Sequence, residues 1–431
     1  MAQKGIREYD AKRMMSQALP LFSQGRLQFE AKQVLIGPQT DIKQLAEENP
    51  WLKKEKLVAK PDQLFGKRGK NNLLFVNKSW SEVQKWIGER MNKTVTIFQT
   101  TGETTGRLTH FLVEKFVPHE EEYYIAITTH RDKDIIHFST RGGVNIEEVW
   151  DSVVKMEVPI LQDIEELDVK GFLPDGLGDK KDIIADFILV LYKMLVEYHF
   201  VYLELNPFTF VNGVPVALDA VAKVDDYASY QCAEYWGDLK FPSPFGLEKT
   251  PEEEKVDELD ARTGASLKLT VLNPEGRVWN LVAGGGASVI YADTVVDLGY
   301  AGELANYGEY SGDPSTELTY GYTRVILDLM TRNKDPRGRE KYLLIGGGIA
   351  NFTDVAKTFT GIIQAITEYK EKLKAANVKI YVRRGGPNYK EGLKNMEDMG
   401  KRLGIPIEVY GPETHMTKIV AMALEARVGE K

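Results

Sequence analysis

Two runs of three glycines occur where the backbone could approach an anion closely. The glycines at 346–348 follow the apolar stretch 342–345, and those at 284–286 follow the apolar stretch 279–283. The residues after each run suit a helix, so the pattern predicts a strand, a glycine turn and a helix in both places. Glycine admits a close ligand, and a helix start offers unpaired N–H groups and the positive end of its dipole. The alternative is that the glycines only permit a tight crossing from strand to helix.

An arginine pair is predicted at the same edge of a sheet as the glycine runs. The spacing of the runs matches neither G-x-G-x-x-G nor a Walker A loop, so it predicts neither a dinucleotide site nor a P-loop. Two such units can converge at the carboxyl ends of neighbouring parallel strands, where α/β sheets bind ligands. Arg383 and Arg384 follow the apolar run VKIYV, and the planar arginine fork pairs well with carboxylates. An exposed pair in an ordinary loop is the alternative. Asn351 is the expected N-cap of the helix after the second run.

A predicted hairpin brings carboxylate and amide oxygens together. Asn212 and Gly213 are a strong signal for a two-residue turn, and residues equidistant from that turn then pair across the hairpin. Asn206 therefore lies opposite Asp219, and Glu204 shares their face. Such hard oxygen ligands suit Mg²⁺ held jointly with substrate phosphates. An ordinary surface hairpin is the alternative, but a proline inside the strand forfeits a ladder hydrogen bond and favours a functional site.

A basic, glycine-containing loop follows another predicted strand. Lys60 lies in the strand, and Lys67, Arg68, Gly69 and Lys70 lie in the loop. One interpretation is a flexible loop that covers phosphates, with Lys60 projecting toward an α- or β-phosphate. A solvated turn would have much the same composition.

Composition limits the class of protein. A chain of 431 residues with 43% hydrophobic and 27% charged residues is typical of a globular protein of two or three domains. The net charge of −8 argues against general nucleic-acid binding. The single cysteine, Cys232, excludes an intrachain disulfide and fits a reducing compartment. The first residues lack the apolar core of a signal peptide, and no apolar run approaches the ~20 residues of a membrane span. We expect a soluble, cytoplasmic protein.

Secondary-structure signals divide the chain. The early part mixes short helices and strands, with a capping box at Ser79 and Glu82, and the run DIIADFILVLYKMLVEYH predicts a later helix. Residues 238–260 are proline-rich and then acidic, which indicates a connection between domains. Five strands alternating with helices follow, and they predict a parallel, doubly wound sheet: LKLTVL, WNLVA, YLLIG, VKIYVRRGG and IPIEVYG. We therefore expect a first domain at 1–240, a linker at 241–265 and a second domain at 266–431.

Several motifs together resemble one family. They are VAKPDQLFGKRGK, FVPH, LELNPF, DARTGASLKL, VAGGGASVIYADT, ELANYGEYSG, IGGGIANFTDVA, VRRGGPNYKEGL and ETHMT. In the same order over nearly the whole chain, they closely resemble the N-terminal part of ATP-citrate lyase and, more distantly, the β subunit of succinyl-CoA synthetase. The resemblance implies an α/β protein in which an α+β ATP-grasp domain is followed by a flavodoxin-like citrate-binding domain.

The resemblance also implies site residues. It implies ATP contacts at Lys60, Arg68, Gly69, Lys115, Val117, Glu122 and Asp219. It implies Mg²⁺ ligands at Asn206 and Asp219, in agreement with the hairpin, and a second cation contact at Asp260, Thr263 and Ala265. It implies citrate contacts at Gly312, Asn351, Phe352, Thr353, Tyr369 and Arg384. The chain departs from other members at Lys115 and Gly348, where they carry proline and serine, and a shorter segment leaves Glu121 as the alternative to Glu122.

The family implies a partner subunit. ATP-citrate lyase passes phosphate through a histidine in a separate CoA-binding region and cleaves citryl-CoA in a citrate-synthase-like region. None of the six histidines here lies in a segment resembling that phosphohistidine loop: His110, His119, His130, His137, His199 and His415. No catalytic residue is therefore expected in this chain, and the partner would supply the phosphohistidine, the CoA site and the lyase region.

The expected function is the ATP- and citrate-binding subunit of a heteromeric ATP-citrate lyase. The complete enzyme would convert citrate, CoA and ATP into acetyl-CoA, oxaloacetate, ADP and phosphate. One alternative is a subunit of citryl-CoA synthetase or another ADP-forming acid–CoA ligase. A non-catalytic citrate or nucleotide sensor is an alternative of a different class.

Overall fold

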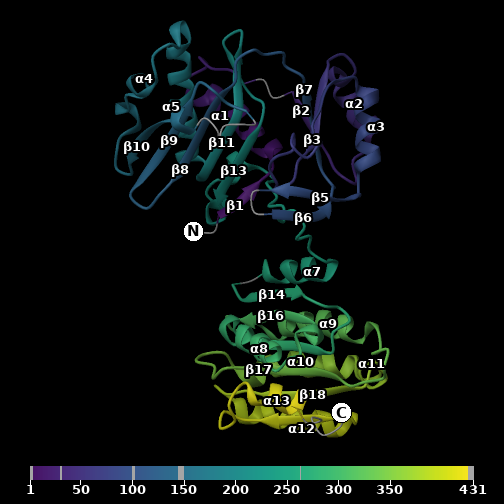
Figure 1. Cartoon of the computed structure of the whole chain (residues 1–431). Helices are drawn as coiled ribbons and strands as arrows, with labels where there is room; N and C mark the ends of the chain where they lie inside the picture. Colours follow the sequence, from purple (N-terminus) through teal and green to yellow (C-terminus); the bar gives the residue numbers. More distant parts are fainter. Residues whose placement is uncertain (1–2, 30–31, 100–101, 144–149, 263, 426–431) are drawn as a thin grey trace. The chain divides into compact units, whose positions relative to one another are not determined.

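Two units, Met1–Glu248 and Lys249–Lys431, each have their own sheets and hydrophobic cores (Figure 1). The structure is a computed structural model that describes residues 3–29, 32–99, 102–143, 150–262 and 264–425. None of the helices within these ranges is long and apolar enough to cross a membrane.

The larger sheet of the first unit is antiparallel, with strand order β1-β13-β11-β8-β9-β10 and β12 paired to β11. Its strands are β1 (Gln3–Ile6), β8 (Tyr123–Thr129), β9 (Lys133–Ser139), β10 (Val154–Pro159), β11 (Phe200–Val211), β12 (Val214–Ala217) and β13 (Ala220–Asp225). The helices α1 (Glu8–Phe22) and α5 (Lys181–Glu197) bury their apolar residues against one face of this sheet, and α5 confirms the predicted helix.

The smaller sheet, with order β2-β7-β3-β4, is also antiparallel and lies beside α2 and α3 in Figure 1. Its elements are β2 (Gln33–Ile36), β3 (Leu57–Pro61), β4 (Phe75–Lys78), β7 (Phe111–Lys115), α2 (Ile42–Glu48) and α3 (Trp80–Arg90). The capping box of Ser79 and Glu82 starts α3, as predicted, and Trp80 and Ile87 on that helix are buried in the core. The strands β5 (Thr94–Gln99) and β6 (Gly102–Arg107) form a separate hairpin.

Short helices complete the chain between these elements. They are η1 (Pro50–Lys53), η3 (Ile164–Glu166), α4 (Val169–Phe172), η4 (Gly178–Lys180), η5 (Asp226–Ser229), α6 (Ala233–Trp236), η6 (Ala301–Glu303) and α11 (Lys370–Ala375).

The predicted hairpin register is confirmed. Val211 pairs with Val214, Phe208 pairs with Ala217, and the N–H of Asn206 donates to the carbonyl of Asp219 at 3.3 Å. The chain then returns along β11 as β13 in the same register from Ala220 to Lys223, and the register shifts between Tyr202 and Phe200. A two-residue turn with favourable chemistry therefore predicts the pairing as far as Tyr202 and Lys223.

The sheet of the second unit is mostly parallel, with order β14-β16-β15-β17-β18-β19. Its strands are β14 (Ser266–Val271), β15 (Val278–Ala283), β16 (Asn306–Ser311), β17 (Lys341–Gly347), β18 (Val378–Arg383) and β19 (Ile407–Tyr410). The expectation that all strands are parallel is wrong for β14, an edge strand that pairs antiparallel with β16. The five predicted strands omit β16, because its buried residues only alternate with less buried ones and form no apolar run.

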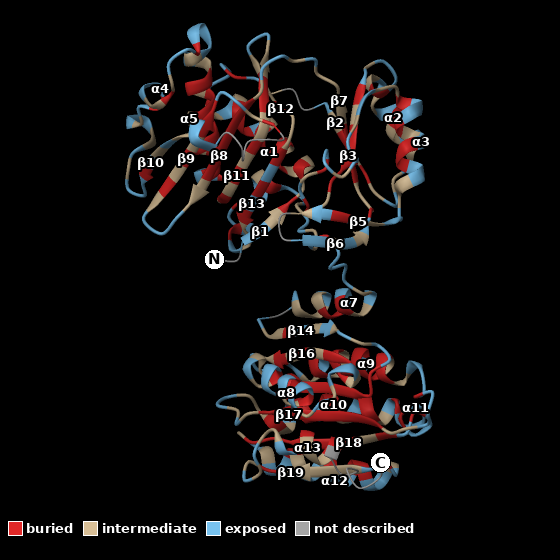
Figure 2. Cartoon of the chain, in the orientation of Figure 1, coloured by how far each residue is buried: buried red, intermediate tan, exposed pale blue. Residues whose placement is uncertain are grey.

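Helices cover both faces of this sheet. One face carries α7 (Pro251–Asp260), α9 (Thr316–Arg332), α10 (Val355–Glu368) and α12 (Tyr389–Leu403), and the other carries α8 (Gly285–Asp297) and α13 (Lys418–Glu425). Every residue of β15 and β17 is therefore buried, as the red of β17 shows in Figure 2, which explains their mostly apolar sequences. The predicted linker at 241–265 includes α7, whose capping box at Thr250 and Glu253 starts the helix and whose Val256 is buried.

The helix after the second glycine run begins later than expected. Asp354, not Asn351, is the N-cap of α10, and its carboxylate accepts the N–H of Lys357 at 3.0 Å. The N–H of Ala350 donates to the carbonyl of Gly385 at 2.9 Å. This hydrogen bond ties the chain just before Asn351 to the segment after β18. The helix therefore begins only at Val355.

Asp62 fixes the start of α1 from the smaller sheet. Its carboxylate accepts the N–H of Glu8 at 2.8 Å and the N–H of Tyr9 at 3.0 Å, and Arg7 donates to its carbonyl at 2.6 Å. The N-cap residue of α1 makes no side-chain cap of its own. Asp62 immediately follows β3, so this cap ties the helix of one sheet to a strand of the other. Burial, with a contribution from the charge of Glu8, raises the pKa of Asp62 to about 6.

The Asp62 cap predicts a pH dependence of stability. A native pKa of about 6 exceeds the ordinary value of about 3.9, so the folded chain binds this proton more tightly than the unfolded chain does. The contribution is therefore favourable below pH ~4, and the free energy of unfolding should fall by roughly 2–3 kcal/mol as the pH rises through 6. Asp62→Asn should flatten this decline. Urea unfolding at several pH values measures it, with Asp41→Asn at the exposed cap of α2 as the control; equal slopes in all three proteins would contradict the prediction.

Candidate functional site

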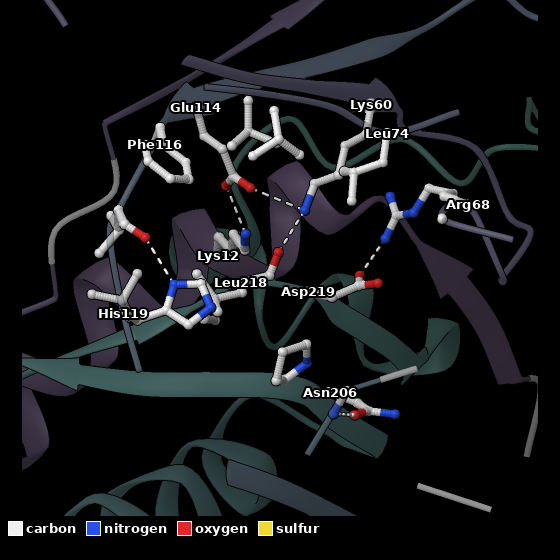
Figure 3. A pocket seen from close by; sticks show the side chains of 18 of the residues that line it. Lys12, Lys60, Arg68, Leu74, Glu114, Phe116, His119, Asn206, Leu218 and Asp219 are labelled. Atoms are coloured by element: carbon white, nitrogen blue, oxygen red, sulfur yellow. Dashed lines mark hydrogen bonds and ion pairs between the residues drawn. The ribbon is translucent and has the colours of Figure 1, made fainter. Parts of the chain in front are cut away.

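A cavity of about 400 Å³ lies in the first unit between its larger and smaller sheets. The smaller sheet contributes Lys60 and Glu114, and the larger sheet contributes Asn206 and the turn that carries Asp219 (Figure 3). The cavity wall includes every residue for which the family resemblance implies an ATP contact: Lys60, Arg68, Gly69, Lys115, Val117, Glu122 and Asp219. Residues far apart in the sequence thus surround one volume.

Buried ion pairs fix the cations at one end of this cavity. The Nζ of Lys60 lies 2.7 Å from Glu8 and 2.9 Å from Glu114, and it donates to the carbonyl of Leu218 at 2.6 Å. The Nζ of Lys12 pairs with the same two carboxylates at 2.7 Å. Burial alone would lower the pKa of Lys60, but Glu114 and Glu8 outweigh it and raise that pKa. Lys60 is therefore a charged ammonium in the wall of the cavity.

Glu8 is the carboxylate shared by these cations. It contacts Lys12 and Lys60, and one of its oxygens lies 2.8 Å from Arg68. Burial would raise the pKa of Glu8, yet Lys12, Lys60 and Arg68 hold it well below its usual range. The sequence interpretation missed Glu8 and Lys12. The available signal was their helical spacing with Met15 in α1, which puts two charges on the buried stripe of that helix.

The hairpin oxygens lie on the same wall. Asp219 pairs with Arg68, and the side-chain oxygen of Asn206 accepts the N–H of Gly143 at 2.8 Å. Loss of hydration within the site raises the pKa of Asp219, and Arg68 opposes that rise. Burial also raises the pKa of Glu204. Among the described residues, no group of three or more His, Cys, Asp or Glu side chains is arranged to hold a metal ion. Mg²⁺ is commonly held by one or two carboxylates together with substrate phosphates, and this donor set fits that mode.

Another part of the cavity wall is formed by Val117, His119 and Glu122, and His119 contacts both of the others. His119 contacts the carbonyl of Val117 at 2.8 Å through Nδ1 and the carboxylate of Glu122 at 3.1 Å through Nε2. Glu122 lines the cavity, whereas Glu121 pairs with Tyr123 outside it. Of the two alternatives left open by the sequence, only Glu122 is positioned to contact a ligand in the cavity.

A second candidate site lies at the carboxyl ends of β15, β17 and β18 in the second unit. Ala283 pairs with Gly347 in parallel register, so the two glycine runs lie side by side, as expected. Arg383 donates to the carbonyl of Gly347 at 2.9 Å, and Nη1 of Arg384 donates to the carbonyl of Gly348 at 2.7 Å. Burial lowers the pKa of Arg384.

The glycines of β17 leave space for side chains from other elements. A Cβ on Gly346 would lie 2.3 Å from the ring of Tyr291 on α8. A Cβ on Gly347 would lie 2.6 Å from Nη1 of Arg384. Packing therefore accounts for glycine at 346 and 347, as the alternative interpretation of the run proposed, and ligand binding at the glycine runs stays a prediction.

The structure brings together some predicted citrate residues and separates one. Asn351, Phe352 and Thr353 lie between β17 and α10, near the arginine segment, and Phe352 is 68% exposed. Gly312 directly follows β16 with a φ of 74°. Tyr369 is instead the C-cap of α10. At 1.5 Å per residue, that helix places Tyr369 about 20 Å from its other end.

Tyr369 lines another cavity, of about 350 Å³, formed by residues of α7 and α9. Of the expected second cation contact, Asp260 and Ala265 lie within the described residues. Asp260 accepts the N–H of Leu267 at 2.7 Å and pairs with Lys268 at 2.5 Å, so its oxygens are engaged within the chain. Ala265 directly precedes β14, and Thr263 lies outside the described residues.

Two family models match the chain. Residues 2–236 match the model described as the ATP-citrate synthase ATP-grasp domain, and residues 247–426 match the one described as ATP citrate lyase citrate-binding. The chain is 47% identical over 425 residues to ATP-citrate synthase alpha chain protein 2 of Arabidopsis thaliana, covering 99% of each protein. It is 47% identical over 430 residues to ATP-citrate synthase of Bos taurus, covering 99% of this chain but 39% of that protein.

Solved structures agree with these matches. The ATP citrate lyase from Methanothrix soehngenii in complex with citrate and coenzyme A has a TM-score of 0.88 and 54% identity, covering 98% of this chain and 100% of that one. A variant of the Methanosaeta concilii ATP citrate lyase in complex with (3S)-citryl-CoA has a TM-score of 0.84 and 52% identity over the same shares.

The shared carboxylate predicts a stability effect. Glu8→Gln removes the charge that three buried cations face, and breaking a buried ion pair from one side costs about 3–5 kcal/mol. We expect the free energy of unfolding of the first unit to fall by roughly 3 kcal/mol at pH 7. Urea unfolding measures this, with Glu89→Gln on the exposed face of α3 as the control. An unchanged midpoint in the Glu8 variant would show that Glu8 does not hold these cations.

Proposed function

The chain belongs to the ATP-citrate lyase (ATP-citrate synthase) family, and we propose that it is the ATP- and citrate-binding subunit of a heteromeric enzyme. The complete enzyme converts citrate, CoA and ATP into acetyl-CoA, oxaloacetate, ADP and phosphate. The observation that carries the proposal is the single cavity that collects Lys60, Arg68, Asn206 and Asp219. The plant relative that matches the chain is named an alpha chain, which supports a subunit that works with a partner chain.

The proposal assigns one ligand to each part of the chain. We assign nucleotide binding by an ATP-grasp domain to the first unit, Met1–Glu248, and citrate binding to the second, Lys249–Lys431, a flavodoxin-like, doubly wound domain whose core includes Val256 from the linker expected at 241–265. The helices on both faces of the second sheet support that last assignment. A cytoplasmic location would fit a protein with one buried, unpaired cysteine.

The ion pairs of the cavity suggest how nucleotide and cation bind together. Arg68 and Asp219 are paired with each other in this structure. A phosphate oxygen would replace Asp219 as the partner of Arg68, which frees Asp219 for Mg²⁺. The cation, held by Asp219 and Asn206, would neutralise charge on the β- and γ-phosphates. Binding of phosphate and cation is thereby coupled through the exchange of partners, while Lys60 stays charged and fixed by its two carboxylates.

The second site would hold a carboxylate ligand. Arg384 supplies a charged donor, and backbone N–H groups at the start of α8 add the positive end of a helix dipole. Asn351, Phe352, Thr353 and Gly312 would contact the rest of the citrate. Tyr369 is not included, because it lies at the far end of α10.

Because the proposal assigns ATP and citrate to different parts of the chain, it includes a phosphate relay and a partner subunit. Direct transfer would need the γ-phosphate within ~3–3.5 Å of the citrate carboxylate. A histidine can carry phosphate covalently between two sites, and we assign it, with the CoA site and the citrate-synthase-like lyase region, to a partner subunit. The nearest alternative is a subunit of citryl-CoA synthetase, which would release citryl-CoA. Identification of the product made with the co-purified partner distinguishes the two, and oxaloacetate formation supports the lyase. A chain that does not bind Mg·ATP and does not promote turnover with its partner would support the alternative of a non-catalytic sensor.

Because the two ligands are assigned to separate sites, a substitution in either site should weaken the binding of one ligand only. Asp219→Asn should weaken Mg·ATP binding about tenfold or more, because it removes a charged ligand, and leave citrate binding nearly intact. Arg384→Ala should weaken citrate ~10–100-fold and leave Mg·ATP intact. Calorimetric titration of both ligands against both variants measures this. Equal loss of both ligands in either variant would indicate misfolding, and unchanged nucleotide affinity would remove Asp219 from the site.

The proposed phosphate relay predicts which subunit carries the phosphate from γ-labelled ATP. The purified chain should bind ATP and citrate but form no acid-labile phosphoenzyme from γ-labelled ATP. With the partner present, label should appear on the partner, and citrate plus CoA should discharge it. Stoichiometric acid-labile phosphate on this chain alone would contradict the split-enzyme proposal.

A further inference from the structure

A row of residues crosses the carboxyl ends of three parallel strands in the second unit. Tyr310 on β16 pairs with Ala283 on β15, and Ala283 pairs with Gly347 on β17. Tyr310, Ala283 and Val382 belong to the core under α9 and α10, so their side chains share that face of the sheet. Arg384 follows Val382 by two residues and still pairs its N–H with the carbonyl of Tyr410 at 3.3 Å. Strand alternation therefore puts the side chain of Arg384 on the same face as Tyr310.

Small residues separate the arginine from the tyrosine. Gly347 has no side chain, and Nη1 of Arg384 lies 2.6 Å from where its Cβ would be, so the guanidinium extends over this glycine toward the row. The two groups interact electrostatically. Burial raises the pKa of Tyr310 and Arg384 opposes it, whereas burial lowers the pKa of Arg384 and Tyr310 opposes it.

Both side chains carry a buried polar atom that the described part of the chain does not satisfy. Arg384 is 4% exposed and Tyr310 is 1% exposed. Nη1 of Arg384 donates to Gly348, but its Nε and the hydroxyl of Tyr310 have no hydrogen-bond partner among the described residues. Native proteins rarely leave such atoms unpaired, because each one loses its hydrogen bond to water on folding. Two unpaired donors beside the predicted anion site indicate that a ligand oxygen completes the set.

We propose that Tyr310 is a further citrate-binding residue, whose hydroxyl donates to the carboxylate that Arg384 binds. The proposal rests on the function proposed above. The carbonyl of Gly348 holds Nη1, which orients the guanidinium and leaves its Nε edge for a carboxylate. The Tyr310 hydroxyl then supplies a third donor to that carboxylate. Because Nε and the hydroxyl are shielded from solvent here, the ligand must displace part of the surrounding chain on binding. We assign that movement to residues 351–353, which have neither helix nor strand and lie between the Ala350–Gly385 hydrogen bond and the Asp354 cap.

Tyr310→Phe tests the proposal, because it removes only the hydroxyl. We expect the citrate dissociation constant, measured by calorimetry, to rise about tenfold while that of Mg·ATP stays unchanged. Without citrate, the melting temperature should stay the same or rise, since the lost hydroxyl had no partner. Tyr322→Phe is the matched control: its ring lies 6.3 Å from that of Tyr310, but its hydroxyl donates to the carbonyl of Lys268 at 2.7 Å. That variant should lower the melting temperature and leave citrate affinity unchanged.

A double-mutant cycle strengthens the test. If both side chains bind one carboxylate, the losses caused by Tyr310→Phe and Arg384→Lys should be less than additive. Citrate binding by the wild-type chain with an unchanged constant in Tyr310→Phe would overturn this inference alone. A fall in melting temperature that matches the Tyr322 control would also overturn it, because the hydroxyl would then have a structural partner. Failure of the wild-type chain to bind citrate at all would overturn the proposed function as well.

Discussion

One buried carboxylate holds the cationic end of the nucleotide cavity together. Glu8 lies within 2.8 Å of Lys12, Lys60 and Arg68, so it compensates charges that would otherwise repel one another away from water. Glu8 starts α1 on the larger sheet, and Lys60 lies on a strand of the smaller sheet. The same interaction that keeps the cations charged therefore also joins the two walls of the cavity. Asp62, just after β3, adds a second connection between the two sheets by capping the start of α1.

The features that could be predicted from the sequence are those fixed by local chemistry. The turn at Asn212 and Gly213 determines the hairpin register, so the approach of Asn206 to Asp219 followed without any knowledge of the rest of the fold. The apolar runs before the glycines likewise determined that two glycine turns end neighbouring strands. The position of Tyr369 also follows from helical spacing, since a residue so far beyond the helix start must lie at its other end; the family resemblance alone suggested otherwise.

The missed features depend on tertiary contacts. An apolar run such as LKLTVL has the same pattern in either direction, and only its pairing with β16 makes β14 antiparallel. Asn351 has the right chemistry for a cap, but the contact between Ala350 and Gly385 delays the helix. Glu8 and Lys12 gain their roles only because β3 and β7 bring Lys60 and Glu114 to them from distant parts of the chain. No local pattern encodes that meeting.

The filled glycine positions of β17 have an evolutionary consequence. The space above Gly347 is filled by Arg384, so even the methyl group of alanine at that position would force the guanidinium to shift. Gly347 is also restricted by a φ of 154° and by the carbonyl of Ala283, which would lie 3.0 Å from a Cβ, so this position favours glycine whichever residue stands at 384. Asn351 and Phe352 are exposed and carry no such restriction. A change of acid ligand within this family should therefore involve substitutions in that loop. Related enzymes that prefer a different acid should differ at the loop residues and keep the residues at the strand ends.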